Sequence, residues 1–215
     1  MRVRDDVAVT AWVAPDRRRW APSPEPGVER VMLDRVGDEV AVATSIVRYR
    51  SGSRFARHVH ERGEEFFVLD GVFQDEHGDY PAGTYVRNPP GTSHAPFSDP
   101  GCLLFVKLRQ FYPADSTTVV VDTCRLPAAT DGEVIVHPLH RFETEEVLLL
   151  DGGAGSAHRF ATTECPREFL CLRGEAYVFG HALTAGAWLR VPPREPSTVR
   201  FESAGRLFVK TRPFV

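Results

Sequence analysis

Short apolar runs separated by turn residues recur along the chain. They are rich in Val, Phe, Tyr and Thr, and Gly, Pro and Asp stand between them at turn spacing. The clearest runs cover 40–49, 64–73, 84–90 and 102–111 in the first half, and 146–153, 168–180, 187–193 and 206–212 in the second. Such runs are typical of antiparallel strands, and only 111–131 leaves room for a short helix. The pattern predicts an all-β protein.

The second half of the chain repeats the first at a shift of 103 residues. Over the 60 ungapped positions from Gly52 there are 18 identities, where composition alone would give roughly 4. The best match joins LLFVKLRQF at 103–111 to RLFVKTRPF at 206–214. A repeat of this size indicates two copies of one structural unit.

Many short antiparallel strands suit a jelly-roll barrel, so two tandem barrels are expected. The predicted divisions are a Pro-rich N-terminal arm packed on the barrel, a first lobe, a connector and a second lobe. Their boundaries are 1–27, 28–112, 113–132 and 133–215. Trp12 and Trp20 are interpreted as anchors of the arm rather than as residues that stack on a ligand.

Composition and charge exclude several classes of function. The formal charge of −3 comes without a basic stripe, which argues against a nucleic-acid partner. No run approaches the ~18 apolar residues of a membrane span, and the charged start MRVRDD is unlike a secretory signal. The four cysteines lack Cys-x-x-Cys spacing. We therefore expect a cytoplasmic protein with reduced thiols and no membrane partner.

Four side chains with metal-ligating groups fall in two segments. His58 and His60 are two residues apart, so on a strand both point to one face. Glu64 follows after a predicted kink at Gly63, and His94 comes from a separate hairpin, NPPGTSHAPF. Three imidazoles and a carboxylate suit zinc, iron, manganese, nickel or copper. The sequence predicts one divalent transition metal per chain.

The repeat distinguishes the two adjacent carboxylates. Under the 103-residue shift Glu64 becomes Arg167, whereas Glu65 stays acidic as Glu168, so Glu64 is interpreted as a ligand and Glu65 as scaffold. The three histidines become, in chain order, Ala161, Thr163 and Ser197. A register slipped by two residues would instead place Thr163 and Cys165 opposite His58 and His60. Both registers predict a second lobe without metal, and Arg167 would repel a cation.

Other polar residues near these motifs are interpreted as structural. A predicted hairpin tip, expected to be solvated, holds Asp75, Glu76, His77 and Asp79. Tyr85 and Arg87 have counterparts in Trp188 and Arg190 of the lobe without ligands, which favours a scaffold role. Nothing besides the four ligands identifies a catalytic acid, base or nucleophile.

Both segments fit the motifs of the cupin family. The first has Gly52, five residues, His-x-His, three residues, Glu64, six residues and Gly71. The second has Gly83, five residues, Pro-x-Gly, two residues and His94, with Ser98 at the usual closing Asn. The chain resembles a bicupin, which implies an all-β double-stranded β-helix (jelly-roll) fold in two tandem barrels.

The sequence from about Val28 to Phe111 resembles the cupin domain of ChrR-type anti-sigma factors. That resemblance implies a metal, commonly zinc, at positions matching His58, His60, Glu64 and His94, with iron, nickel or manganese as alternatives. In that family the cupin domain governs release of a sigma factor, which a separate N-terminal helical zinc domain binds. The residues before the first lobe lack a His-Cys cluster of that kind, so we expect no direct sigma-factor binding.

Three functions follow from these expectations. The resemblance favours a regulatory or sensory protein that responds to an oxidant or a small molecule. The alternatives are a non-haem dioxygenase, resembling acetophenone- or flavonol-cleaving cupins and acting on a small aromatic or carbonyl substrate, and a metal-stabilised barrel that only binds a ligand. A small-molecule ligand or substrate is the expected partner, a protein partner is compatible, and both monomer and homodimer are open.

Overall fold

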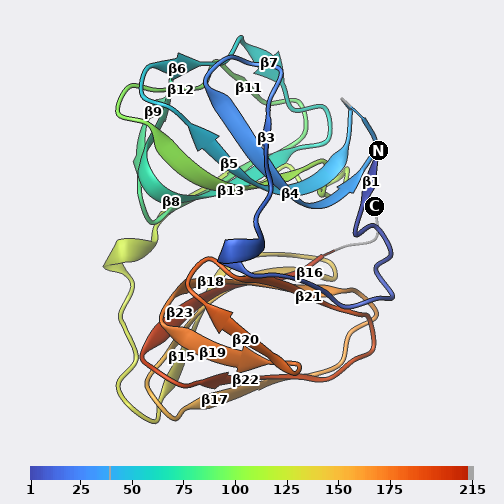
Figure 1. Cartoon of the computed structure of the whole chain (residues 1–215), viewed down its shortest axis with the longest axis vertical. Helices are drawn as coiled ribbons and strands as arrows, with labels where there is room; N and C mark the ends of the chain where they lie inside the picture. Colours follow the sequence, from blue (N-terminus) through green and yellow to red (C-terminus); the bar gives the residue numbers. More distant parts are fainter. Residues whose placement is uncertain (39, 213–215) are drawn as a thin grey trace. The chain divides into compact units, whose positions relative to one another are not determined.

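The computed structural model describes residues 1–38 and 40–212 and is built almost entirely of β-strands (Figure 1). Contacts divide the chain into two compact units. Of the described residues, unit 1 comprises Met1–Asp5 and Arg19–Arg125, and unit 2 comprises Asp6–Arg18 and 126–212. Pro213 and Phe214, which end the best sequence match, lie outside the described residues, as does Val215 of the predicted second lobe.

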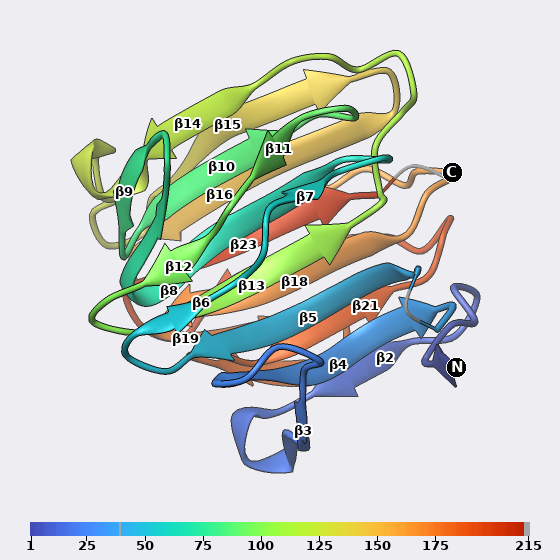
Figure 2. The same cartoon turned by 90° about the horizontal axis from the view of Figure 1, so that it is seen from above.

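Unit 1 is a sheet in the order β1-β4-β5-β13-β8-β10-β14, with short strands paired beside it. Figure 2 shows β4, β5, β13 and β8 lying side by side. Long β8 also pairs with β9 and β12, and β7 pairs with β11. The strands are β1 (Arg2–Val3), β3 (Trp20–Pro22), β4 (Val28–Val36), β5 (Val42–Tyr49), β6 (Ser53–Arg54), β7 (His58–Val59), β8 (Glu64–Asp75), β9 (Gly78–Pro81), β10 (Thr84–Asn88), β11 (Ser93–His94), β12 (Phe97–Ser98), β13 (Cys102–Leu108) and β14 (Val119–Asp122).

Unit 2 has a six-stranded sheet, β15-β16-β23-β18-β21-β2, and a four-stranded sheet, β17-β22-β19-β20. Its strands are β2 (Ala11–Val13), β15 (Val134–Phe142), β16 (Glu145–Gly152), β17 (Ala157–Phe160), β18 (Arg167–Arg173), β19 (Glu175–Val178), β20 (His181–Thr184), β21 (Trp188–Val191), β22 (Ser197–Phe201) and β23 (Gly205–Thr211). Two 3-10 turns, η1 (Pro15–Arg17) and η2 (Thr123–Arg125), complete the structure. The turn η2 falls where the sequence leaves room for a short helix.

Equivalent hydrogen bonds place the two halves of the repeat in the 103-residue register. Gly91 N donates to His60 O at 2.9 Å, and Arg194 N donates to Thr163 O at 2.7 Å. Further along, Gly83 N donates to Val68 O, and Gly186 N donates to Cys171 O. Both members of each pair differ by 103 residues, so the alternative register slipped by two residues is wrong.

Each unit buries an apolar cluster between its strands. In unit 1 the cluster includes Phe66, Phe73 and Leu104, and in unit 2 it includes Phe169, Leu189 and Phe201. Alternate residues of the strands supply these side chains, as the alternating pattern of the sequence predicts. The structure is thus all-β, as the sequence predicts. The pairings among the described residues leave the sheets open, so the arrangement as two closed barrels stays a prediction.

The segments outside the repeat take part in the sheets of both units. Of the N-terminal arm, β1 and β3 pair with β4 in unit 1, whereas β2 pairs with β21 in unit 2. From the predicted connector, β14 pairs with β10 in unit 1. The arm tryptophans pack as anchors, since Trp12 lies 5.4 Å from the His181 ring and Trp20 lies beneath the Arg48 guanidinium at 4.1 Å. The contacts therefore group these segments differently from the divisions predicted at 1–27 and 113–132.

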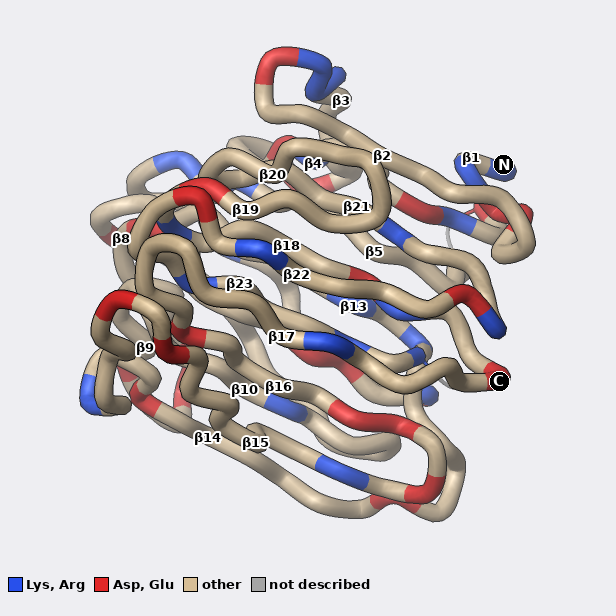
Figure 3. Tube along the Cα trace, turned by 90° about the horizontal axis from the view of Figure 1, so that it is seen from below, with Lys and Arg blue, Asp and Glu red and all other residues tan. Residues whose placement is uncertain are grey.

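Acidic and basic residues are interspersed along the described chain (Figure 3). Such mixing matches the small formal charge of −3. Among the described residues, no helix is both long and apolar enough to span a bilayer.

Candidate metal centre

Strands β7 and β11 bring two of the predicted ligands face to face. The two strands are antiparallel, and His94 lies directly opposite His58. Before β11 the chain turns at Pro89–Thr92, where Thr92 N donates to Pro89 O and Gly91 has φ of 88°. Before β8 it turns at Gly63, with φ of 79°. Glycine adopts these left-handed angles without a steric penalty, so the two turns let separate segments meet at one point.

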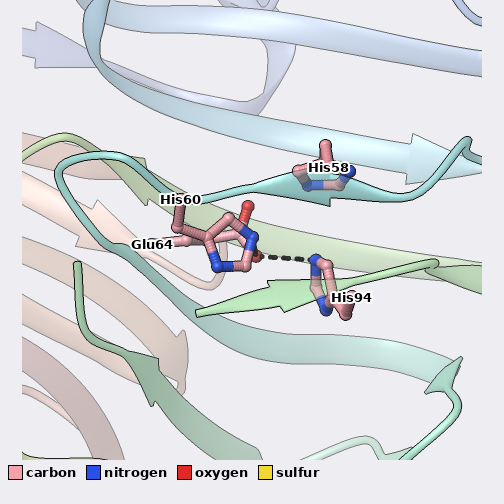
Figure 4. Close-up of side chains that lie close together, drawn as sticks. All are labelled: His58, His60, Glu64 and His94. Atoms are coloured by element: carbon pink, nitrogen blue, oxygen red, sulfur yellow. Dashed lines mark ion pairs between the residues drawn. The ribbon is translucent and has the colours of Figure 1, made fainter. Parts of the chain in front are cut away.

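The four predicted ligands converge in unit 1 (Figure 4). One ligating atom from each of His58, His60, Glu64 and His94 lies within 4.8 Å of all the others. The imidazole centroids are 4.6 to 5.1 Å apart. Glu64 Oε1 lies 3.5 Å from His60 Nε2 and 3.4 Å from His94 Nε2. This donor set matches the nitrogen and oxygen ligands of first-row transition metals.

The three imidazoles are oriented by contacts of their Nδ1 atoms. His58 Nδ1 lies 3.0 Å from Ala56 O, and His60 Nδ1 lies 3.0 Å from Thr92 Oγ1. His94 Nδ1 lies 3.0 Å from Asp75 Oδ2. A histidine whose Nδ1 is held in this way presents Nε2 as the free ligating atom, which is the usual arrangement around protein-bound metals.

Two ligating atoms of the cluster are buried without a hydrogen-bond partner among the described residues. They are Nε2 of His60 and Nε2 of His94, whose residues are 6% and 2% exposed. A buried polar atom without a partner is costly unless something binds it. A cation at the centre of the cluster would satisfy both nitrogens and the Glu64 carboxylate, so the residues present fit a divalent metal.

Burial and charge act differently on the two buried histidines. Burial lowers the pKa of His60, which outweighs the opposing charge of Glu64 and keeps the imidazole neutral. Burial also acts to lower the pKa of His94, but the hydrogen bond to Asp75 and the charge of Glu64 outweigh it, so this pKa is raised. Neutral imidazole is the ligating form. The lowered pKa of His60 favours the neutral, ligating form of its imidazole, whereas the raised pKa of His94 favours the protonated form.

Asp75 differs from the prediction made for the hairpin tip. It is 7% exposed rather than solvated, and besides His94 it accepts hydrogen bonds from Tyr80 Oη and from the backbone N of His77. The hydrogen bonds to His94 and His77 lower the pKa of Asp75 against the effect of burial. The neighbouring Glu76 accepts from Ala95 N, beside His94. This hairpin tip therefore orients a predicted ligand, because the fold brings it beside a residue 19 positions away.

The residues interpreted as scaffold form a separate buried network. Arg87 donates from Nη1 to Glu65 Oε2 at 2.5 Å and from Nη2 to Asp115 Oδ2 at 2.6 Å. Its guanidinium also lies 4.1 Å from the Phe111 ring centroid. Glu65 thus points away from the histidine cluster, as the repeat indicates. Tyr85 is fully buried and lies on β10, the strand that also carries Arg87.

In unit 2 an arginine side chain lies among the residues that replace the ligands. Arg167 Nη1 donates to Ala161 O and to Ser197 Oγ, both at 3.2 Å. Its guanidinium lies 4.4 Å from the Phe160 ring centroid. The corresponding turn also differs, since Arg194 takes the left-handed backbone angle of Gly91, with φ of 65°. The positively charged guanidinium of Arg167 therefore lies among the residues that correspond to the predicted ligands of unit 1.

A cavity of about 320 Å³ opens beside the histidine cluster in unit 1. The four predicted ligands form part of its wall, together with apolar side chains. Its exposed lining residues Pro24, Val59 and Glu61 place the mouth at the surface. The site can therefore admit a small molecule next to a bound metal.

Comparison with known proteins gives a family match for the first part of the chain. Residues 9–112 match the model of the ChrR Cupin-like domain. No curated protein matches the chain.

Solved structures share the fold over nearly the whole chain. Protein YlbA from Escherichia coli has a TM-score of 0.73 at 15% identity, covering 97% of this chain and 93% of that one. The bacterial pirin YhhW from Escherichia coli, in complex with nickel(II), has a TM-score of 0.71 at 14% identity, covering 96% and 100%. A candidate dioxygenase from Nostoc punctiforme PCC 73102 has a TM-score of 0.69 at 14% identity, covering 94% and 79%. The chain therefore has the cupin fold, and its residues 9–112 resemble the ChrR Cupin-like domain.

Proposed function

We propose that unit 1 binds one divalent transition metal through His58, His60, Glu64 and His94, and that unit 2 binds none. The observation that carries this proposal is the pair of buried Nε2 atoms, of His60 and His94, that face Glu64 without another partner among the described residues. Arg167 supports the second part, because its guanidinium stands among the residues that replace the ligands. We propose zinc as the resident ion and a bicupin arrangement of two barrels.

We further propose that the metal centre has a regulatory or sensory role. The match of residues 9–112 to the ChrR Cupin-like domain supports this role, and the cavity beside the ligands gives an oxidant or a small molecule access to them. The metal would supply a positive charge in the wall of the cavity. The chain's own residues would hold it: Thr92 orients the His60 imidazole, Asp75 orients that of His94, and apolar side chains line the cavity beside them.

The second candidate is a metal-dependent dioxygenase acting on a small aromatic or carbonyl substrate. The fold shared with the candidate dioxygenase of Nostoc punctiforme favours it. The identity of the metal separates the two, since tetrahedral zinc with four protein ligands is closed, whereas six-coordinate iron keeps two positions for substrate and oxygen.

Elemental analysis of the purified protein and of single variants tests the ligand assignment. We expect one metal ion per wild-type chain, and loss of that stoichiometry in His58→Ala and His94→Ala. His77→Ala is the matched control, because His77 lies in the same unit with 64% of its side chain exposed. Circular dichroism would establish that each variant is folded. Full metal content in a folded His94→Ala protein would refute the assignment.

A further inference from the structure

The cavity of unit 1 has an apolar body as well as the metal cluster in its wall. Its apolar lining includes Val28, Val47, Phe66, Phe73, Leu104 and Val106. Its volume of about 320 Å³ is at the lower end of the range for small-molecule sites, which combine apolar walls with a few polar groups that fix orientation. A ligand here would be a compact, largely apolar molecule.

Three arginines also line the cavity, and two of them have partners. Arg35 donates from Nε to Gly37 O at 3.2 Å and from Nη2 to Asp38 O. Arg109 forms an ion pair of 2.7 Å with Glu61. These two guanidiniums are therefore occupied with groups of the chain itself.

The third arginine, Arg30, is different. It lies on β4 opposite Val47, another lining residue, and it is partly buried. Its Nε is buried without a hydrogen-bond partner, and its side chain has no ion pair within the part of the chain that the structure describes. A guanidinium in partly desolvated surroundings is stabilised when an anion pairs with it. The wall of the cavity thus carries a positively charged guanidinium, that of Arg30, to which an anionic ligand could bind.

We infer that this cavity binds a small organic carboxylate with an apolar body, and that Arg30 binds its carboxylate group. The planar guanidinium donates two parallel hydrogen bonds to a carboxylate, which gives geometric specificity as well as affinity. The apolar walls would bury the rest of the molecule. The inference deepens the proposed function by naming its ligand class, and it rests on that function only for the part of the cavity that holds the metal.

Isothermal titration with benzoate tests the inference, with benzyl alcohol as a neutral probe of similar size. We expect benzoate to bind saturably to the Zn²⁺-loaded protein, and Arg30→Gln to weaken it about tenfold or more, as the loss of a charged hydrogen-bond donor predicts. The affinity for benzyl alcohol should be the same in wild type and Arg30→Gln. The matched control is Arg125→Gln, because Arg125 is 87% exposed and pairs with Asp122 outside the cavity.

A second variant, and the same titration on the protein without Zn²⁺, make the outcome decisive. Arg30→Lys keeps the charge but not the forked donor, so it should retain part of the benzoate affinity and serves if Arg30→Gln does not fold. Equal benzoate affinity in wild type and Arg30→Gln, or no saturable benzoate binding in either metal state, would overturn the inference. A chain that takes up no metal but binds benzoate through Arg30 would overturn the proposed function alone.

Discussion

Asp75 lies outside the proposed ligand set but contacts one of its histidines. Its Oδ2 accepts the hydrogen of His94 Nδ1 at 3.0 Å, which fixes the tautomer that presents Nε2 to the cluster. Asp75→Asn removes the negative charge and lets an amide N–H face Nδ1. We expect metal affinity to fall by roughly 10- to 100-fold, the usual effect of losing such a partner. Competition titration against a chromophoric chelator measures it.

Asp79→Asn is the control for this variant. Asp79 belongs to the same hairpin, but its Oδ1 accepts from Gln74 Nε2 and it does not contact a histidine of the cluster. Wild-type metal affinity in Asp75→Asn would show that His94 is oriented by the backbone of β11 alone.

The individual residues differ in how far sequence could predict them. The set His58, His60, Glu64 and His94 is predicted by spacing, because a two-residue separation on a strand and a glycine turn fix which side chains can meet. Asp75 could not be predicted, since its contact with His94 depends on how β8 passes β11 in space. The same holds for Arg30, because only the structure shows that its buried Nε has no hydrogen-bond partner among the described residues.

At the scale of elements, Arg167 joins three segments of unit 2. From the start of β18 it reaches Ala161 after β17, Ser197 on β22 and Thr211 on β23, the last through a hydrogen bond of 3.3 Å from Nε. Glu64 begins β8 at the corresponding place in unit 1. The first residue of the strand is thus a predicted metal ligand in unit 1, Glu64, and the centre of a hydrogen-bond network in unit 2, Arg167.

Replacing Arg167 by alanine should therefore destabilise the fold without affecting metal content. The change leaves Ala161 O and Ser197 Oγ without their donor and removes the contact with Phe160. We expect a loss of roughly 1.5–3 kcal/mol in the free energy of unfolding, the usual range for hydrogen bonds to a charged group. Urea denaturation measures it, with Arg159→Ala on the exposed side of β17 as control. An unchanged midpoint would mean that the network adds nothing to stability.

The edge strands are elements that the repeat does not predict. The sheet of unit 1 ends at β14, which pairs with β10, whereas the sheet of unit 2 ends at β2, which pairs with β21. Strands β10 and β21 correspond in the repeat, yet β14 comes from the middle of the chain and β2 from its N-terminal part. An exposed sheet edge accepts backbone hydrogen bonds from any extended segment, so the sequence pattern alone does not say which segment covers it.

At the scale of the whole molecule, the two units share a strand plan but differ in what their equivalent positions hold. The duplicated pattern predicted this plan because turn glycines and core residues recur at the same shift. In the proposed function only unit 1 binds the metal, because Ala161, Thr163, Arg167 and Ser197 replace all four proposed ligands in unit 2. A ligand that binds only unit 1 should stabilise only unit 1.

Hydrogen exchange measured by mass spectrometry tests this asymmetry. Zn²⁺ at a free concentration a hundred times its dissociation constant stabilises a binding-competent fold by about 2.7 kcal/mol. We expect amide exchange to slow in peptides from β7, β8 and β11, and not in those from β17, β18 and β22. The His94→Ala variant should lose the slowing and provides the control. Equal slowing in both units of the wild type, or slowing confined to the strands around Arg167, would place the cation elsewhere, because a metal protects the strands that carry its ligands.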